Sequence, residues 1–142
     1  MLLLLSATPV TADTDLAVIP TPTGILRLVQ REHDRALFVN KGEIFKGSEF
    51  LEIVEVYRLE TRKSVLLKDM TGPIHCPVQF FFMSFEYNGD GIPERSPSFG
   101  HCNDQPNIMV KDKKVIVEFD AFGAMAPKTY IFDGVELTEK TD

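Results

Sequence analysis

The sequence contains no tryptophan, few histidines, only two cysteines and no long apolar run. A transmembrane helix needs about 18 or more consecutive apolar residues, so no membrane-spanning segment is expected. Basic residues are in the minority: 15 Lys and Arg stand against 21 Asp and Glu, and the formal net charge is −6. Proteins that bind nucleic acid present a basic face to the phosphates, so we do not expect a nucleic-acid partner.

Signatures of the common enzyme classes are also missing. There is no G-x-S-x-G nucleophile elbow, no P-loop, no H-E-x-x-H helix and no dinucleotide-binding fingerprint. We therefore expect a protein that is not an enzyme and that takes no cofactor. A glycosidase-type pair of carboxylates stays open, because only the distance between two carboxyl groups tests it.

The chain does contain enough apolar material for one folded domain. Of its 142 residues, 44% are hydrophobic and 11 are phenylalanine, which favours a single globular unit. Residues 1–12 carry no charge, open with apolar side chains and end in Val10-Thr11-Ala12, a small-residue pattern that a signal peptidase reads. We interpret residues 1–12 as a residual signal peptide and residues 13–142 as a single β domain, periplasmic or secreted. The alternative is an apolar N-terminus of a cytosolic protein, since the usual basic start of a signal peptide is missing.

The two cysteines, Cys76 and Cys102, agree with export. An even number of cysteines in an oxidising compartment favours a disulfide, and closing a loop of about 27 residues stabilises the fold by roughly 3.5 kcal/mol. The dipeptides His75-Cys76 and His101-Cys102 also raise a zinc site and a Cys–His nucleophile as alternatives. Adjacent residues on a strand point to opposite faces, which disfavours zinc. We expect no metal site, and a disulfide flanked by two partly exposed histidines.

Short apolar stretches separated by turn residues predict strands along the whole chain. Their spacing predicts an all-β fold, an antiparallel sandwich or small barrel built from successive hairpins, with about eight strands. Residues 50–59 suit either a strand or a helix, and their β-branched side chains favour a strand. The tail 138–142 is polar and is expected to fray. The other predicted strands are 25–29, 36–39, 43–46, 65–67, 78–87, 108–110, 115–119, 129–132 and 135–137.

The most apolar of these strands spans residues 78–87. Phe80 and Phe82 fall on one face, while Phe81, Met83 and Phe85 fall on the other. A strand that is apolar on both faces is typical of the centre of a fold, so we expect this strand to be covered on both sides.

The longest predicted loop follows this strand, at residues 88–98. Asn88-Gly-Asp-Gly91 is similar to the middle of a calcium-binding loop, but Pro97 stands where such a loop needs its bidentate glutamate. The density of turn-forming residues favours an ordinary surface loop instead. Because loops on rigid scaffolds commonly carry function, we predict a partner-binding loop. Its predicted contact residues are Asp90, Ile92, Glu94, Arg95 and Ser96.

The C-terminal half resembles small exported bacterial β proteins. The resemblance is carried by Cys76-Pro77, Phe80–Phe82, Ser96–Cys102, Val115–Phe119 and Tyr130–Gly134. In general type the chain is similar to periplasmic immunity proteins and lysozyme inhibitors, which are small, exported, β-rich and disulfide-bonded. This resemblance implies a non-enzymatic binding protein, and the acidic chain would encounter a basic cell-wall hydrolase or toxin faster through opposite charge.

Three other functions stay open at this stage, as does the oligomeric state. A carrier of small apolar ligands would need a barrel cavity lined by Phe80–Phe85 and Phe119–Phe122. A hydrolase would use the Cys–His pair or scattered carboxylates. A purely structural role in an envelope complex has no sequence feature that separates it from a binding protein.

Overall fold

The computed structural model describes residues 13–70, 76–89 and 91–140, and this part of the chain forms strands and no helix. The predicted signal peptide 1–12 lies outside the described residues. The thirteen strands of the described part are β1 (Thr14–Thr21), β2 (Gly24–Gln30), β3 (Arg35–Val39), β4 (Gly42–Gly47), β5 (Glu52–Arg58), β6 (Arg62–Asp69), β7 (Val78–Glu86), β8 (Glu94–Arg95), β9 (Phe99–His101), β10 (Asn107–Lys111), β11 (Lys114–Phe119), β12 (Lys128–Phe132) and β13 (Leu137–Lys140).

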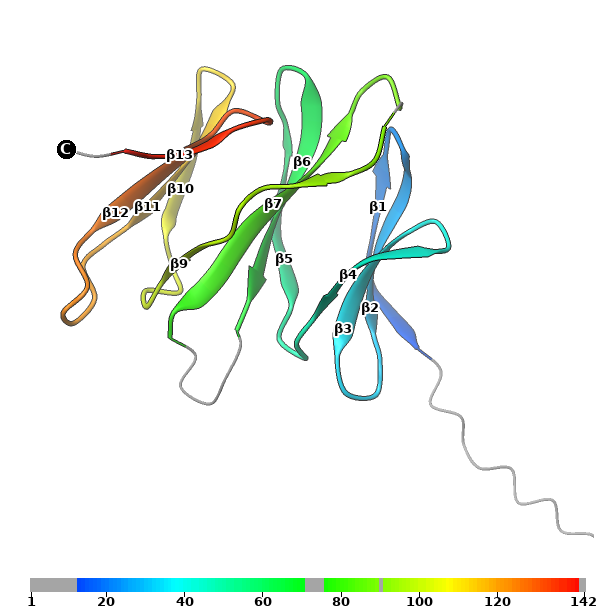
Figure 1. Ribbon diagram of the computed structural model, residues 1–142, viewed down its shortest axis with the longest axis horizontal. Coiled ribbons are helices and arrows are strands. Elements are labelled where there is room, and N and C mark those ends of the chain that lie inside the picture. Colours follow the sequence, from blue (N-terminus) through cyan, green and yellow to red (C-terminus); the bar gives the residue numbers. More distant parts are fainter. Residues whose placement is uncertain (1–12, 71–75, 90, 141–142) are drawn as a thin grey trace, which may run out of the picture.

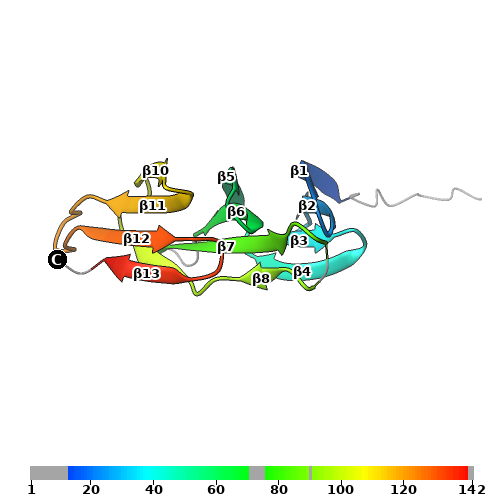
Figure 2. The ribbon, with the colours of Figure 1, turned by 90° about the horizontal axis from the view of Figure 1, so that it is seen from above.

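The strands form three antiparallel sheets in chain order (Figure 1). Sheet A has the order β1-β2-β3-β4, sheet B has β5-β6-β7-β8, and sheet C has β10-β11-β12-β13. In sheet B, β8 pairs with Met83 and Ser84 of β7, and β9 pairs with Val78–Phe80 of the same strand. Each sheet is therefore an up-and-down meander, and the first strands β1, β5 and β10 lie along one side of the molecule (Figure 2).

The sheets stack face to face, with sheet B between the other two (Figures 1 and 2). Two separate cores follow from this arrangement. The core between sheets A and B contains Leu26, Leu28, Leu37, Leu51, Val65, Leu67, Phe81, Met83 and Phe85. The core between sheets B and C contains Tyr57, Leu59, Leu66, Val78, Phe80, Phe82, Phe99, Val115, Val117, Phe119, Tyr130 and Phe132.

The expectation for β7 is confirmed. Phe80 and Phe82 pack in the B–C core, whereas Phe81, Met83 and Phe85 pack in the A–B core. The strand has β6 on one edge and β8 with β9 on the other, so it lies in the middle layer of the fold.

Within residues 50–59, Glu52–Arg58 form strand β5, and a bulge explains the helix-like spacing of the segment. The register with β6 shifts between Ile53 and Glu55. A bulge adds one residue and resets which face the following side chains take. As a result Ile53 and Val56 contact the A–B core, while Val54 and Tyr57 contact the B–C core.

The all-β fold of successive antiparallel hairpins is confirmed, and it is a layered stack in which no sheet closes into a barrel. The described residues hold more strands than the eight expected, since β1, β8 and β9 were not anticipated. The boundary at the last hairpin was also wrong. The Asp133 carboxylate accepts the backbone N–H groups of Val135 and Glu136 (2.8 and 2.7 Å), which widens the turn. Strand β13 therefore begins at Leu137 and includes Thr138–Lys140, which were expected to fray.

Truncation of a core ring tests the two-core packing. Phe82 is fully buried and stacks on Phe132, with 4.1 Å between ring centroids. We expect Phe82→Ala to lower the free energy of unfolding by about 3–5 kcal/mol in urea denaturation, because it leaves a cavity. The matched control is Phe122→Ala, whose ring is 55% exposed and whose loss should change stability by less than about 0.5 kcal/mol.

The predicted disulfide is present: Cys76 and Cys102 are bonded, with 4.7 Å between their Cα atoms. It lies just beyond the last β7–β9 pair, Val78 with His101. The bond therefore joins the start of β7 to the end of β9 and encloses most of the second half of sheet B.

Removing this bond should destabilise the fold measurably. We expect the double variant Cys76→Ser/Cys102→Ser to lose about 2–5 kcal/mol of unfolding free energy, because the unfolded chain is no longer constrained. The comparison is wild type in urea with and without a reductant. If the reductant left the urea midpoint of the wild type unchanged, the bond would have no stabilising role.

Candidate functional site

The predicted partner-binding loop follows the C-terminal end of β7, at the upper edge of sheet B in Figure 1. Asp90 lies outside the described residues. Ile92 is 87% exposed, the highest value among the large apolar side chains of the described chain. An exposed isoleucine at the tip of a loop offers an apolar group to a partner without any rearrangement of the loop.

Glu94 is held at the base of this loop by an arginine from the neighbouring strand. The Arg62 guanidinium of β6 contacts the Glu94 carboxylate at 2.6 Å and the Glu86 carboxylate at 3.2 Å. The Arg62 side chain is 12% exposed, whereas both carboxylates are largely open to solvent. Arg62 therefore bridges the end of β7 and the start of β8.

Arg95 points the other way, toward sheet A. Its guanidinium lies over the rings of Phe45 and Phe81, at 5.5 and 5.6 Å from their centroids. Such cation–π contacts typically contribute about 0.5–1 kcal/mol at exposed sites. Arg95 therefore fixes β8 against the rim of the A–B core.

Ser96 is buried, although it is one of the predicted contact residues. Its hydroxyl accepts the N–H of Phe82 at 2.8 Å and donates to the Pro97 carbonyl at 3.0 Å. The Ser96 N–H in turn donates to the Phe82 carbonyl at 2.8 Å. Ser96 thus anchors the loop to β7 by satisfying a buried backbone group, and the exposed loop surface is formed by Ile92, Glu94 and Arg95.

A groove of about 400 Å³ lies beside the loop. The Tyr87 hydroxyl donates to the Leu59 carbonyl, and Arg58 lies 5.7 Å from the centroid of the Tyr87 ring. Gly89 has a φ of +74°, and a Cβ there would come within 2.8 Å of the Pro22 carbonyl, so only glycine fits this approach to the β1–β2 turn. The groove is lined by Thr61, Arg62, Glu86, Tyr87, Asn88 and Val135.

Most of these groove residues were not identified from the sequence. They come from three separate turns, and local patterns do not report which distant turns meet. Residues 60–63 lie between the predicted strands 50–59 and 65–67, and nothing in them indicated that Arg62 reaches across to the loop after β7.

The histidine expectation was wrong for His101, and His75 lies outside the described residues. His101 is fully buried and stacks on Phe119 with 5.0 Å between ring centroids. Its Nδ1 accepts the N–H of Asn103 at 2.9 Å, so Nε2 carries the proton and donates to the Ala126 carbonyl at 2.9 Å. The ring is a satisfied core group that holds the β11–β12 connection.

The disulfide restricts the chemistry that is possible at the two cysteines. Both sulfur atoms are bonded to each other, so neither is a thiolate nucleophile or a zinc ligand. Within residues 13–70, 76–89 and 91–140, no group of three His, Cys, Asp or Glu side chains is placed to hold a metal ion.

The phenylalanines fill the cores and do not line a cavity. Phe82 stacks on Phe132, and Phe99 stacks on Phe80 and Phe82, at 4.1–5.9 Å between centroids. Phe122 lies in the β11–β12 connection and is 55% exposed. Because the sheets remain open and the rings interdigitate, the carrier hypothesis finds no barrel cavity here.

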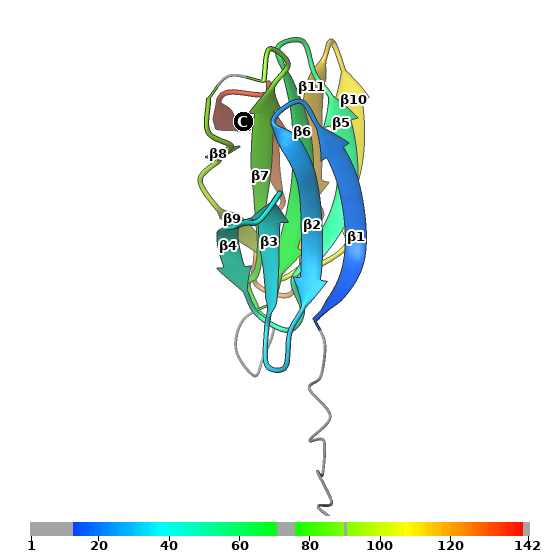
Figure 3. The ribbon, with the colours of Figure 1, turned by 90° about the vertical axis from the view of Figure 1, so that its right-hand side faces the viewer.

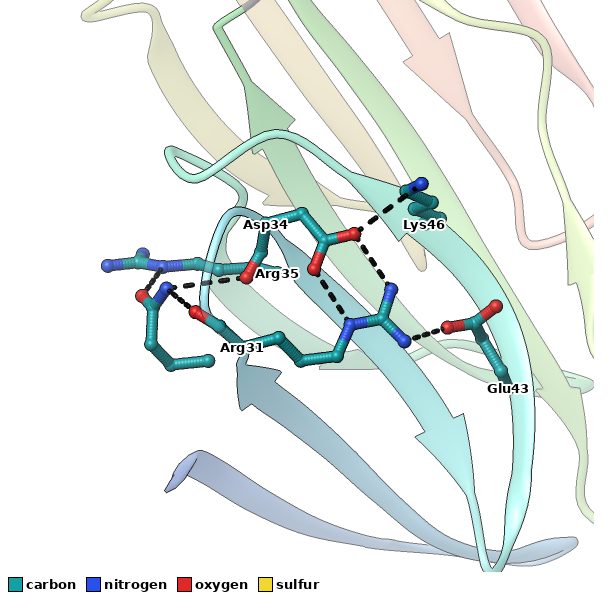
Figure 4. A network of polar contacts seen from close by, with 6 residues as sticks. Arg31, Asp34, Arg35, Glu43 and Lys46 are labelled. Atoms are coloured by element: carbon teal, nitrogen blue, oxygen red, sulfur yellow. Dashed lines mark hydrogen bonds and ion pairs between the residues drawn. The ribbon is translucent and has the colours of Figure 1, made fainter. Parts of the chain in front are cut away.

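A network of charges covers the outer face of sheet A, at its β3–β4 side (Figure 4). Arg31 forms a bidentate pair with Asp34 (2.7 and 2.9 Å) and also bonds to Glu43. Lys46 is 3.8 Å from Asp34, and Arg31 also lies over the Phe38 ring at 6.0 Å. The guanidinium holds the pKa of the Asp34 carboxyl below its ordinary value, mainly through these hydrogen bonds.

This pairing predicts an acid-dependent loss of stability. A carboxyl with a lowered folded-state pKa stabilises the fold above its unfolded-state pKa, near 4, and this contribution is lost as the pH falls through the folded-state value. We expect Asp34→Asn to lower the unfolding midpoint at pH 7, and the difference from wild type to shrink below about pH 4. Glu32→Gln is the control, since that carboxylate is 77% exposed beside His33. A difference between wild type and Asp34→Asn that stayed constant from pH 7 to pH 2 would contradict the ion-pair origin.

Comparison with protein-family models, with curated proteins and with solved structures gave no match. No helix long and apolar enough to cross a membrane occurs in the described part of the chain. The disulfide is consistent with an oxidising, exported compartment.

Proposed function

We propose that this chain is an exported, non-enzymatic binding protein whose loop after β7 contacts a basic protein partner. The partner class we propose is a cell-wall hydrolase or toxin, which the chain would inhibit or neutralise. The observation that carries this proposal is the 87% exposure of Ile92 on a loop that is tied down on either side of its tip.

Pre-organisation of the loop supports a binding role. Downstream of Ile92, β8 pairs with β7, Arg95 packs on two rings, and Ser96 bonds to the Phe82 backbone. Upstream, Gly89 lies against the Pro22 carbonyl. A loop that is already ordered loses less conformational entropy on binding, so more of its contact energy appears as affinity.

The charge of the whole chain supports a basic partner. Its formal net charge is −6, and the Glu94 side chain at the loop is 63% exposed. Complementary charge raises the rate of association and makes it dependent on salt. The apolar tip would then supply short-range contact after electrostatic encounter.

The remaining support comes from the chemistry that the described residues do not offer. Both thiols are consumed in the disulfide, and His101 is buried with both ring nitrogens bonded. The groove beside the loop holds Glu86 and Arg62, which are paired with each other. These groups suit recognition of a charged surface better than proton transfer.

Binding to a defined panel tests this proposal. The panel consists of a basic c-type lysozyme, a basic peptidoglycan amidase and a basic nuclease toxin, each titrated by calorimetry in low salt. We expect one of these classes to bind. Its affinity should fall as salt rises from 50 to 500 mM, because salt screens charges that lie further apart than the Debye length, about 10 Å at 0.1 M salt. For that partner, Ile92→Asp should weaken binding at least ten-fold, which corresponds to about 1.4 kcal/mol.

The matched control is Phe122→Asp, which changes an exposed apolar side chain in the β11–β12 connection, at the other end of the molecule (Figure 1). It should leave the affinity unchanged. Equal affinity of wild type and Ile92→Asp would place the contact elsewhere, and a complete lack of binding across the panel would exclude this partner class.

A further inference from the structure

The outer face of sheet C is the end of the stack opposite sheet A. Sheet B is covered on both sides, and the outer face of sheet A carries the Arg31–Asp34–Glu43 network and an Arg27–Asp15 pair at 3.0 Å, beside the exposed side chains of Val18 and Ile25. The four strands of sheet C form the left-hand end of the stack in Figures 1 and 2. No other sheet of the described chain lies against that side.

The register shows which side chains this face presents. Val115, Val117 and Phe119 of β11 point into the B–C core, so the alternate positions point outward. Met109, Ile116, Ile131 and Thr138 are directly opposite one another across the four strands. The three apolar side chains and Thr138 form one row across the middle of the outer face, which we call the apolar row.

Charged and polar side chains flank the apolar row in an ordered way. Two residues further along each strand, on one side of the apolar row, lies a second outward-facing row formed by Asn107, Glu118, Thr129 and Lys140. On the other side lie Lys111 and Lys114, which are opposite each other at the β10–β11 turn. Lys114 also shares a shallow pocket with Ile131, Asp133, Glu136 and Thr138, which places the two acids on this same side.

This pattern is complementary to itself. A two-fold axis along the apolar row would turn one copy of the face onto another and exchange the two flanking rows. Glu118 of one copy would then lie over Lys114 of the other, because both are on β11 with Ile116 midway between them. The same rotation brings Lys140 of β13 over Glu136, while Lys111 would face Asn107 and Asp133 would face Thr129. Within the described residues Glu118 has no ion-pair partner in its own chain, so the second copy would supply one.

We propose that the chain forms a symmetric dimer through the outer face of sheet C, with the apolar rows in contact and Glu118 paired to Lys114 of the second copy. The arrangement repeats the face-to-face stacking that already joins sheets A, B and C (Figure 2). It leaves free both the loop after β7, at the edge of the middle layer, and the outer face of sheet A, which is turned toward the viewer in Figure 3. The proposal does not depend on the binding role of Ile92.

The size of the face sets the expected strength of the dimer. Four strands at about 4.8 Å spacing and roughly five residues at about 3.4 Å give a flat area of roughly 300 Å² per copy, or roughly 600 Å² for the pair. This lies below the roughly 1,200 Å² of a standard stable interface. We therefore expect a weak dimer that is populated only at high micromolar concentrations and that dissociates as salt is raised.

Charge reversal tests the proposed pairing with the full chain. Sedimentation equilibrium from 10 μM to 1 mM should show a monomer–dimer equilibrium for wild type. Glu118→Lys places two lysines over each other at both symmetric positions and should abolish the dimer. The double variant Glu118→Lys/Lys114→Glu restores opposite charges across the two-fold axis and should restore the dimer to within a few-fold of wild type.

Three further measurements complete the test. Ile131→Lys interrupts the apolar row and should also give a monomer, and Met109→Lys, at a position 39% exposed, replaces it if that variant fails to fold. Glu32→Lys makes the same charge change in the β2–β3 turn of sheet A and should leave the equilibrium unchanged. A wild-type chain that stays monomeric to 1 mM, or a double variant that stays monomeric while folded, would overturn the proposal, as would larger open assemblies in place of a dimer.

Discussion

The alternation of side chains along β7 is the constraint on which the rest of the structure depends. Successive residues of a strand point to opposite faces, and Val78–Phe85 is apolar at nearly every position. A sheet built around such a strand exposes too much apolar surface if either face is left open, so it needs two covering layers. Sheets A and C supply those layers, and they do so from the two ends of the chain. The three-layer stack therefore follows from one strand, because it is the most economical way to remove both of its faces from water.

The same middle layer explains where the chain has freedom to carry function. The second half of sheet B is held by the disulfide between Cys76 and Cys102, by the Ser96 contacts with Phe82, and by the Arg62 bridge. These interactions fix the segment after β7 on both sides of Ile92. The consequence is an exposed apolar side chain, Ile92, on a supported loop at the edge of the middle layer. Binding surfaces with this character lose little entropy on association.

The two terminal layers end the stack in different ways. On sheet A, arginine side chains lie over Phe38 and are neutralised by carboxylates from β1, the β2–β3 turn and β4. These pairs cover part of that face, beside the exposed side chains of Val18 and Ile25. On sheet C, the central isoleucines Ile116 and Ile131 are flanked by Glu118 on one side and by Lys114, which lies near Asp133, on the other. The contrast arises from the placement of a few charged residues, since both sheets have the same four-stranded topology.

The amino-acid sequence by itself determined the local features of this protein. Period-two alternation identifies strands, the two-faced pattern of Phe80–Phe85 places β7 in the middle, and the pair of cysteines identifies the disulfide. Turn chemistry was less informative, because the Asp133 side chain bonds to two backbone groups and shifts the start of β13. The bulge in β5 gave residues 50–59 a spacing that also suits a helix, although their β-branched side chains favoured a strand, since the extra residue is visible only against the partner strand β6. The candidate site was predicted in part, because loop 88–98 is a local signal, whereas Arg62 and Tyr87 reach it across the fold.

Only the tertiary structure decided whether each side chain became a contact, an anchor or a core group. Ser96 and His101 have polar side chains of a kind usually found at the surface, yet both are buried. Ser96 follows β8 and His101 ends β9, and both segments pair with β7, which brings backbone partners within hydrogen-bond distance. The number of layers was also decided at this level, since hairpins of the same pattern can close into a barrel or stack as open sheets. Here the volume of the interlocking phenylalanine rings fills the space between the sheets and favours stacking. Local patterns record which residues avoid water, and packing determines which surfaces they meet when they do so.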